Sequence, residues 1–233
     1  SLRSHFWHHT DKDRTGLTPF VFNRDFSFES YANYALSVPM YFIKRDEKYI
    51  DMTGTTFKNF LEKNIDKNGK KYDPTIADWA DHLSTLFPQV RLKQYLEVRS
   101  MDACSWKEIC SPAAFWTGIL YDEQSLSESY DLTQDWTQED RFLVNENVPE
   151  HGLKTKIQNK TLLEFSKTLI KISEEGLKRR NNLSSNGEYD ETYYLKNIKE
   201  NINNSMSPAD FLLQKYNGIW NKSVDPIYKE LIF

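Results

Sequence analysis

The sequence contains few cysteines, glycines and prolines, and it has no long apolar run. Two cysteines occur, Cys104 and Cys110, which excludes a secreted disulfide framework and indicates a reducing compartment, so we expect a cytoplasmic protein. No apolar run approaches the roughly 20 residues needed to cross a bilayer, and we therefore expect no membrane partner. Glycine and proline occur eight times each, and this scarcity favours long helices.

The charge balance is only mildly acidic. The 30 basic and 34 acidic side chains leave a net charge of −4, which argues against non-specific nucleic-acid binding as the main activity. With 39% hydrophobic and 27% charged residues in 233, the composition is globular, and it excludes disordered and collagen-like classes. The chain begins at Ser1 without an initiator methionine or a targeting signal, so we expect the later part of a longer protein.

The first part of the chain alternates between predicted helices and short strands. Residues 1–24 are dense in polar side chains and indicate a short strand followed by a loop. Two β-rich runs, residues 38–43 and 49–52, flank a polar turn and predict a hairpin. Apolar spacing and capping residues predict helices over residues 27–36, 56–63 and 76–86.

Residues 90–100 alternate between apolar and ionic side chains and predict one strand with two unlike faces. Glu97 and Arg99 lie two residues apart, so both point to the ionic face. A carboxylate there can bind Mg²⁺ and a guanidinium can bind phosphate, which together would position a metal–nucleotide. The alternative is an ordinary ion pair on a half-exposed strand.

The region after residue 104 is predicted to be mostly helical. Residues 105–129 predict one long helix, or two helices that meet near Pro112. Capping residues and amphipathic spacing predict further helices that begin near Thr137, Thr161, Tyr193, Ser207 and Asp225.

Several familiar catalytic motifs are missing. The sequence contains no G-x-S-x-G, Walker A or G-x-G-x-x-G motif, so triad hydrolases, P-loop enzymes and Rossmann enzymes have no support. His5, His8 and His9 are poorly spaced for a metal site, and the two cysteines are expected to be structural. The aromatic runs are expected in the core rather than in a base-stacking platform, because no basic patch interleaves them; they are Phe20, Phe22, Phe26, Phe28, Trp116 and Tyr121.

Ordered blocks along nearly the whole chain resemble the glutamate–cysteine ligases of the plant and proteobacterial type, specifically their C-terminal half. The blocks include RSHFW at residues 3–7, TDKDRTG at 10–16, YALSVPMYF at 34–42, YIDMTG at 49–54, YLEVR at 95–99 and PAAFWTG at 112–118. Because so many blocks occur in the same order, a chance resemblance is excluded.

This resemblance implies an α+β fold of the glutamine-synthetase-like class, in which an antiparallel sheet with flanking helices carries the site. Residues 1–103 would supply part of that sheet with short helices, and residues 104–233 would form a helical region packed on it within a single domain. The implied reaction uses ATP to join the γ-carboxylate of L-glutamate to L-cysteine through γ-glutamyl phosphate, the first step of glutathione biosynthesis. Mg²⁺ is the implied cofactor.

The same resemblance implies roles at the nucleotide. Glu97 corresponds to a family metal ligand, and Arg99 corresponds to an arginine that meets the nucleotide phosphates. Arg3 has a counterpart that contacts substrate or nucleotide. Such phosphoryl chemistry needs cations and guanidinium groups around the transferring group and no protein nucleophile.

The resemblance also implies amino-acid-binding residues. Arg14 is expected to hold a glutamate carboxylate, and Arg91 is a second candidate for an anion clamp. A charged loop held by its own ion pairs is the alternative for Arg14. Met40 and Tyr41 are expected to line the amino-acid pockets, and Trp116 lies in a block near the substrates.

Full members of the family are about twice as long, and their N-terminal half supplies further metal-binding glutamates and part of the sheet. We therefore expect this chain to be inactive alone, with the missing half as its partner and a homodimer as an option. Two alternatives stay open: a carboxylate–amine ligase for another amine, and a non-catalytic module that binds amino acids or partners.

Overall fold

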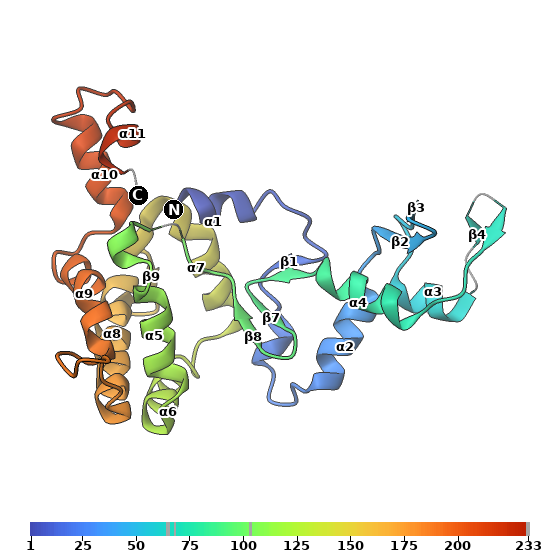
Figure 1. Cartoon of the computed structure of the whole chain (residues 1–233), viewed down its shortest axis with the longest axis horizontal. Coiled ribbons are helices and arrows are strands. Elements are labelled where there is room, and N and C mark those ends of the chain that lie inside the picture. Colours follow the sequence, from blue (N-terminus) through green and yellow to red (C-terminus); the bar gives the residue numbers. More distant parts are fainter. Residues whose placement is uncertain (64–65, 68, 103, 232–233) are drawn as a thin grey trace. The chain divides into compact units, whose positions relative to one another are not determined.

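The chain opens with a short helix, α1 (Leu2–Trp7), where the sequence predicted a strand. That prediction was wrong, because the Ser1 hydroxyl accepts the Ser4 amide at 3.2 Å and so starts a helical turn. The computed structural model describes residues 1–63, 66–67, 69–102 and 104–231 (Figure 1). They form two compact units, the N-terminal unit (residues 5–101) and the helical unit (residues 1–4 with 102–233).

The N-terminal unit combines short helices with two-stranded pairings. Its elements are β1 (Thr15–Gly16), a 3₁₀ helix (Pro19–Phe22), α2 (Phe28–Ser37), β2 (Phe42–Arg45), β3 (Lys48–Asp51), α3 (Phe57–Lys63), β4 (Asp66–Lys67), β5 (Lys70–Lys71), α4 (Ile76–Ser84), β6 (Phe87–Pro88), β7 (Val90–Leu92) and β8 (Leu96–Val98). Helix α2 packs against α3, and α4 packs against β2 (Figure 1). The three predicted helices and the first hairpin are confirmed.

Local signals explain the start of these elements. Thr75 and Asp78 form the predicted capping box of α4, which satisfies amide groups that the first turn leaves unpaired. Asp46 and Glu47 adopt left-handed φ angles of 48° and 61° and connect β2 to β3, the geometry of a tight hairpin turn. Strand β2 contributes Ile43 to a buried core cluster, which also contains Met40, Met52, Phe57 and Phe60.

Residues 90–98 form an antiparallel hairpin, β7–β8, instead of the single strand that was predicted. The sequence lacks a Gly, Pro, Asn or Asp turn signal between the two strands. Leu92 pairs with Leu96, and Arg91 pairs with Glu97, so the paired residues keep their predicted faces. Lys93 and Tyr95 of the three-residue connection, which were predicted on the ionic face, line the same pocket as Leu92 and Leu96. The two predicted faces therefore survive in the paired strands although the single strand does not.

The helical unit contains most of the remaining elements. They are a 3₁₀ helix (Trp106–Glu108), α5 (Ser111–Leu120), α6 (Glu123–Asp131), α7 (Gln138–His151), a 3₁₀ helix (Gly152–Lys154), β9 (Lys156–Ile157), β10 (Lys160–Thr161), α8 (Leu162–Arg180), a 3₁₀ helix (Glu191–Leu195), α9 (Lys196–Asn203), α10 (Pro208–Asn217) and α11 (Ile227–Glu230). Helices α5 and α6 lie beside α8 (Figure 1).

Residues 105–129 contain two helix boundaries: a 3₁₀ helix ends at Glu108 before α5 begins at Ser111, next to Pro112 as predicted, and a second break, between α5 and α6, lies at Tyr121–Asp122. Pro112 occupies the first turn of α5, where the missing amide hydrogen costs nothing. Asp122 caps α6 by accepting the Ser125 amide at 2.8 Å and pairs with Arg179 of α8 at 2.7 Å. The second break is thus fixed by a cap and a tertiary ion pair.

Close packing of α5 on α8 depends on two glycines. A Cβ atom at Gly118 would clash with the Ser173 backbone of α8, and one at Gly176 would clash with the Gly118 carbonyl. The absence of both side chains lets the helix backbones approach. Around this crossing, the buried core consists of Ala114, Ile170, Leu177, Leu195 and Ile202.

The mixed helix and strand content agrees with the predicted α+β class. The described strands form two-stranded sheets, and one of these, β1 with β6, is parallel. The two compact units divide between residues 101 and 102, and the assignment of both regions to a single domain stays a prediction. Across the described residues, no helix combines the length and the apolar character that crossing a membrane requires.

Candidate functional site

Hairpin β7–β8 brings three of the predicted site residues together on one face. Arg91 and Glu97 are direct cross-strand partners, and Arg99 follows Glu97 by two residues on the same face. Arg99 donates from Nη1 to Glu97 Oε1 at 2.7 Å, and Arg91 donates from Nε to Glu97 Oε2 at 2.8 Å. One carboxylate therefore lies between two guanidinium groups, and we call these three residues the ionic triad.

The electrostatics of the ionic triad follow from this geometry. The hydrogen bond from Arg91 is the largest cause that lowers the pKa of Glu97 below its ordinary value; burial opposes it, and the charge of Arg91 and the contact with Arg99 lower the pKa further. Two cations and one anion leave the triad with a net positive charge, which suits an anionic ligand such as phosphate.

Burial distinguishes the two arginines. Arg91 is 8% exposed, and its Nη1 also donates to the Ser84 and Leu86 carbonyls. The Arg99 side chain is 23% exposed, and its guanidinium lies 5.4 Å from the Phe87 ring centroid. Sequence spacing identified all three charged residues but gave no sign of the carbonyl partners of Arg91.

The ionic triad by itself offers a magnesium ion a single carboxylate, that of Glu97. Both Glu97 oxygens accept hydrogen bonds from guanidinium groups, and the described part of the chain contains no group of three or more His, Cys, Asp or Glu residues that could hold a metal. A lone carboxylate beside two cations supplies too few oxygen ligands for Mg²⁺. The described residues thus do not fit the cofactor, and the metal role of Glu97 stays a prediction.

Arg14 lies in a second cluster of the N-terminal unit. It is 1% exposed and donates from Nε to Asp11 at 2.7 Å, from Nη1 to Thr85 at 3.0 Å and from Nη2 to the Pro39 carbonyl at 2.5 Å. Its guanidinium stacks 3.6 Å from the Tyr41 ring centroid, a favourable cation–π geometry. These internal contacts match the alternative of a loop held by its own ion pairs, while binding of a glutamate carboxylate stays untested.

Tyr41 and Met40 differ in their surroundings although they are adjacent. The Tyr41 hydroxyl donates to Asp11 at 3.0 Å, and 38% of the residue is exposed. Burial raises the pKa of Asp11, but hydrogen bonds from Arg14, the Asp13 backbone and Tyr41 outweigh it and hold the pKa below its usual range. Met40 is 1% exposed and belongs to the core cluster, so of these two side chains Tyr41 is the one that reaches the surface.

Arg3 and Trp116 belong to the helical unit. Arg3 lies on α1 and is half-buried. Trp116 lies on α5, also half-buried, with its ring edge-on to Phe115 at a centroid distance of 5.2 Å. The structure therefore groups six of the predicted residues in the N-terminal unit and places two in the other unit.

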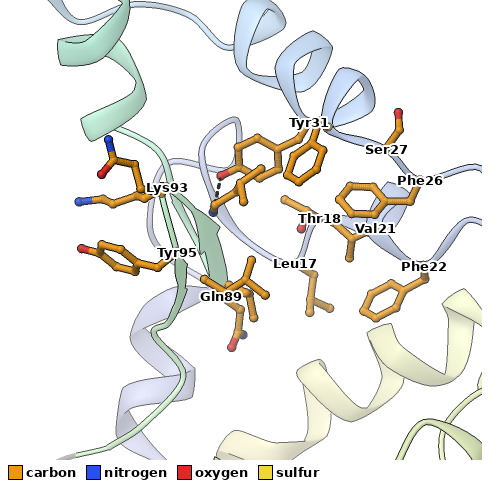
Figure 2. A pocket seen from close by; sticks show the side chains of 15 residues that line it. Leu17, Thr18, Val21, Phe22, Phe26, Ser27, Tyr31, Gln89, Lys93 and Tyr95 are labelled. Atoms are coloured by element: carbon orange, nitrogen blue, oxygen red, sulfur yellow. Dashed lines mark hydrogen bonds between the residues drawn. The ribbon is translucent and has the colours of Figure 1, made fainter. Parts of the chain in front are cut away.

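An apolar pocket of about 970 Å³ lies on the other face of hairpin β7–β8 (Figure 2). Its walls come from residues 17–31 and 89–96, and Leu92 and Leu96 contribute the apolar face of the hairpin. Phe22, Phe26 and Phe28 also line it and are 50%, 43% and 80% exposed. The prediction that these aromatic residues lie in the core was wrong, and it was also wrong for Tyr121, which is 72% exposed. Sequence period and composition do not distinguish a core face from a pocket wall or an exposed face.

Comparison with known proteins gives a consistent result. A family model described as glutamate–cysteine ligase family 2 matches residues 1–230. Over all 233 residues, the chain is 44% identical to the chloroplastic glutamate–cysteine ligase of Solanum lycopersicum and 45% identical to that of Arabidopsis thaliana, covering 43% of each. It is 42% identical to chloroplastic glutamate–cysteine ligase A of Oryza sativa subsp. indica, covering 46% of it. The chain thus spans less than half the length of these relatives.

Proposed function

The chain belongs to glutamate–cysteine ligase family 2, and on this premise we propose that its full-length protein uses ATP to join the γ-carboxylate of L-glutamate to the amine of L-cysteine. In the proposed reaction, a carboxylate oxygen attacks the γ-phosphorus of ATP and ADP leaves. The cysteine amine then attacks the acyl carbon of the γ-glutamyl phosphate, inorganic phosphate leaves, and the amine nitrogen loses a proton to solvent.

The observation that carries this proposal is the ionic triad. Charge develops on the transferring phosphoryl group, and fixed cationic donors stabilise it more than they stabilise the ground state. Arg99 meets this requirement, because it projects from a hydrogen-bonded hairpin and remains partly exposed. We therefore propose that Arg99 binds the phosphates of ATP.

The other predicted residues enter the proposal with different support. Tyr41 is exposed enough to contact an amino acid, and the Arg14 guanidinium stacks on the Tyr41 ring. For Arg14 to bind a glutamate carboxylate, one of its internal hydrogen bonds would have to exchange. Arg3 at the nucleotide, and Met40 and Trp116 near the amino acids, remain proposals that rest on the family resemblance.

The finer fold assignment is also a proposal. Isolated two-stranded hairpins are marginally stable, and hairpins β2–β3 and β7–β8 are two-stranded among the described residues. Strands from the remainder of the longer protein would extend them into the glutamine-synthetase-like sheet. The compartment likewise stays a proposal: cysteine usage predicts the cytoplasm, whereas the similar proteins are named chloroplastic.

The test of the proposed function is ADP release by the full-length protein with MgATP and glutamate, with and without cysteine. Arg99→Ala is expected to reduce cysteine-dependent release by about 100-fold, the usual loss for one charged donor at the transferring group. Arg99→Lys is expected to recover only part of it, because an ammonium cannot donate as a planar fork.

Arg24→Ala is the matched control, since Arg24 is an exposed arginine of the same unit and is expected to leave turnover unchanged. Near-normal turnover in Arg99→Ala would refute the phosphate role. Release that depends on another amine would favour the alternative carboxylate–amine ligase, and no release by the unmodified protein would favour a non-catalytic module.

A further inference from the structure

Arg91 and Arg99 hold the same carboxylate in different ways. Arg91 directs both Nε and Nη2 at Glu97 Oε2, at 2.8 and 2.6 Å. Its Nη1 donates at 3.1 Å to each of two carbonyl oxygens, those of Ser84 and Leu86, between the end of α4 and β6. The Arg91 guanidinium thus donates to three groups, two backbone carbonyls and one carboxylate, and these contacts fix its position. Only 9% of the Arg91 side chain is exposed.

Arg99 occupies the outer side of the same carboxylate. It contacts Oε1 through Nη1 at 2.7 Å and keeps 23% of its side chain exposed, compared with 29% for Glu97. An anion that arrives from solvent therefore meets the more exposed Arg99 and Glu97 before it meets Arg91.

We propose that Arg91 is a positioning residue that retains Glu97, while Arg99 is the arm that exchanges its contact with Glu97 for phosphate. This inference rests on the proposed function, in which Arg99 binds the nucleotide phosphates. It differs from the sequence-based expectation that Arg91 is itself an anion clamp.

The physical reason is competition between two anions for one guanidinium. While Arg91 neutralises Oε2, Glu97 depends less on Arg99, and phosphate can displace Oε1 at low cost. Without Arg91, Glu97 has Arg99 as its remaining partner in the triad and competes more strongly with phosphate. Arg91 thus promotes phosphate binding through Glu97 and without contact to the phosphate.

Binding of inorganic tripolyphosphate to the full-length protein, measured by titration calorimetry in metal-free buffer at physiological salt, tests this mechanism. Glu97→Gln is expected to bind tripolyphosphate more tightly than the unmodified protein, because the competing carboxylate is gone. Arg91→Gln is expected to bind about fivefold more weakly, the order of one charge-assisted hydrogen bond. The double variant Arg91→Gln, Glu97→Gln is expected to bind as tightly as Glu97→Gln.

Lys93→Gln is the matched control for charge. Lys93 is an exposed cation of the connection between β7 and β8, and its loss removes one positive charge from the same hairpin. A change in Lys93→Gln equal to that in Arg91→Gln would assign the effect to net charge and overturn the proposal. If Arg91→Gln weakens tripolyphosphate binding equally in the presence and absence of the Glu97 carboxylate, Arg91 contacts the phosphate directly. That result would also overturn the proposal.

A measurement on the unmodified protein covers the case in which Arg91→Gln does not fold. With ¹⁵N-labelled arginine, tripolyphosphate is expected to shift the Nε–H resonance of Arg99 and to leave that of Arg91 in place. An equal shift of both resonances would refute the division of roles. Neither calorimetry nor the arginine resonances require turnover. Failure of the proposed ligase function, which ADP release tests, can therefore be distinguished from failure of this inference.

Discussion

Buried polar side chains of the N-terminal unit are bonded to backbone carbonyls on other elements. His82 Nε2 donates to the Ala35 carbonyl at 2.8 Å, and Arg14 and Arg91 donate to the carbonyls of Pro39 and Leu86. Each of these hydrogen bonds gives a backbone carbonyl a partner. It also holds the donating imidazole or guanidinium group in one orientation. At this scale, the position of a functional side chain depends on the backbone of another element.

His82 gives a pH dependence that can be measured. It is 2% exposed and stacks on Phe57. Burial lowers its pKa below the ordinary value of 6.5, which the Ala35 hydrogen bond opposes and the charge of Arg14 reinforces. The unfolded chain therefore binds the proton first on acidification, so the stabilisation is complete above about pH 6.5 and is lost as the pH falls below it.

We expect the melting temperature of the unmodified protein to fall between about pH 7 and pH 5, and His82→Gln to flatten that dependence. The measurement is thermal unfolding at a series of pH values. His9→Gln, at an exposed histidine of the same unit, is expected to keep the original slope. Identical slopes in the unmodified protein and in His82→Gln would show that His82 does not cause the effect.

Two hairpins of the N-terminal unit, β2–β3 and β7–β8, differ in the sequence of the short connection between their strands. The β2–β3 turn needs two left-handed residues, whereas the β7–β8 connection lacks the usual turn residues. The first hairpin was predicted from sequence and the second was not. An element with a weak local turn signal depends on its packing, here on Arg91 at the ionic face and Leu92 at the pocket face.

Glu47→Gly is expected to stabilise the N-terminal unit by about 0.5–1 kcal/mol, because glycine adopts the left-handed conformation without strain. Glu47 has φ 61° and pairs with Lys44 at 3.0 Å. Glu47→Ala removes the same ion pair without relieving the strain, so it is the control and is expected to be less stable than Glu47→Gly. Urea unfolding compares the three proteins, and equal stability of the two variants would contradict the strain argument.

Across the whole molecule, the predicted site residues divide between two units, and the described residues supply too few metal ligands for the implied cofactor. The chain also covers less than half of its relatives' length. For the proposed phosphoryl transfer we therefore expect further metal ligands from residues beyond these 233.

We therefore expect residues 1–233 alone to release no ADP in a cysteine-dependent manner, while the full-length protein does. Both proteins would be assayed with MgATP and glutamate, after near-ultraviolet circular dichroism has established that each is folded. Cysteine-dependent release by the shorter chain would show that its own residues complete the site.

The sequence by itself determined the family, the α+β class and the elements that begin with a strong local signal. Capping at Thr75, Thr137, Thr161 and Ser207, and the turn between β2 and β3, act over only a few residues. Such signals can be predicted from the sequence, because the two partners of each hydrogen bond are close along the chain.

Only the tertiary structure decided the environment of the functional side chains. Arg14 reaches Thr85, 71 residues away, and residues 17–31 meet residues 89–96 around the apolar pocket. Burial, carbonyl partners and competition for a guanidinium arise when distant segments pack, and no local pattern encodes them. The sequence could therefore identify Arg91, Glu97 and Arg99, but only the packed hairpin separates a fixed arginine from an exchangeable one.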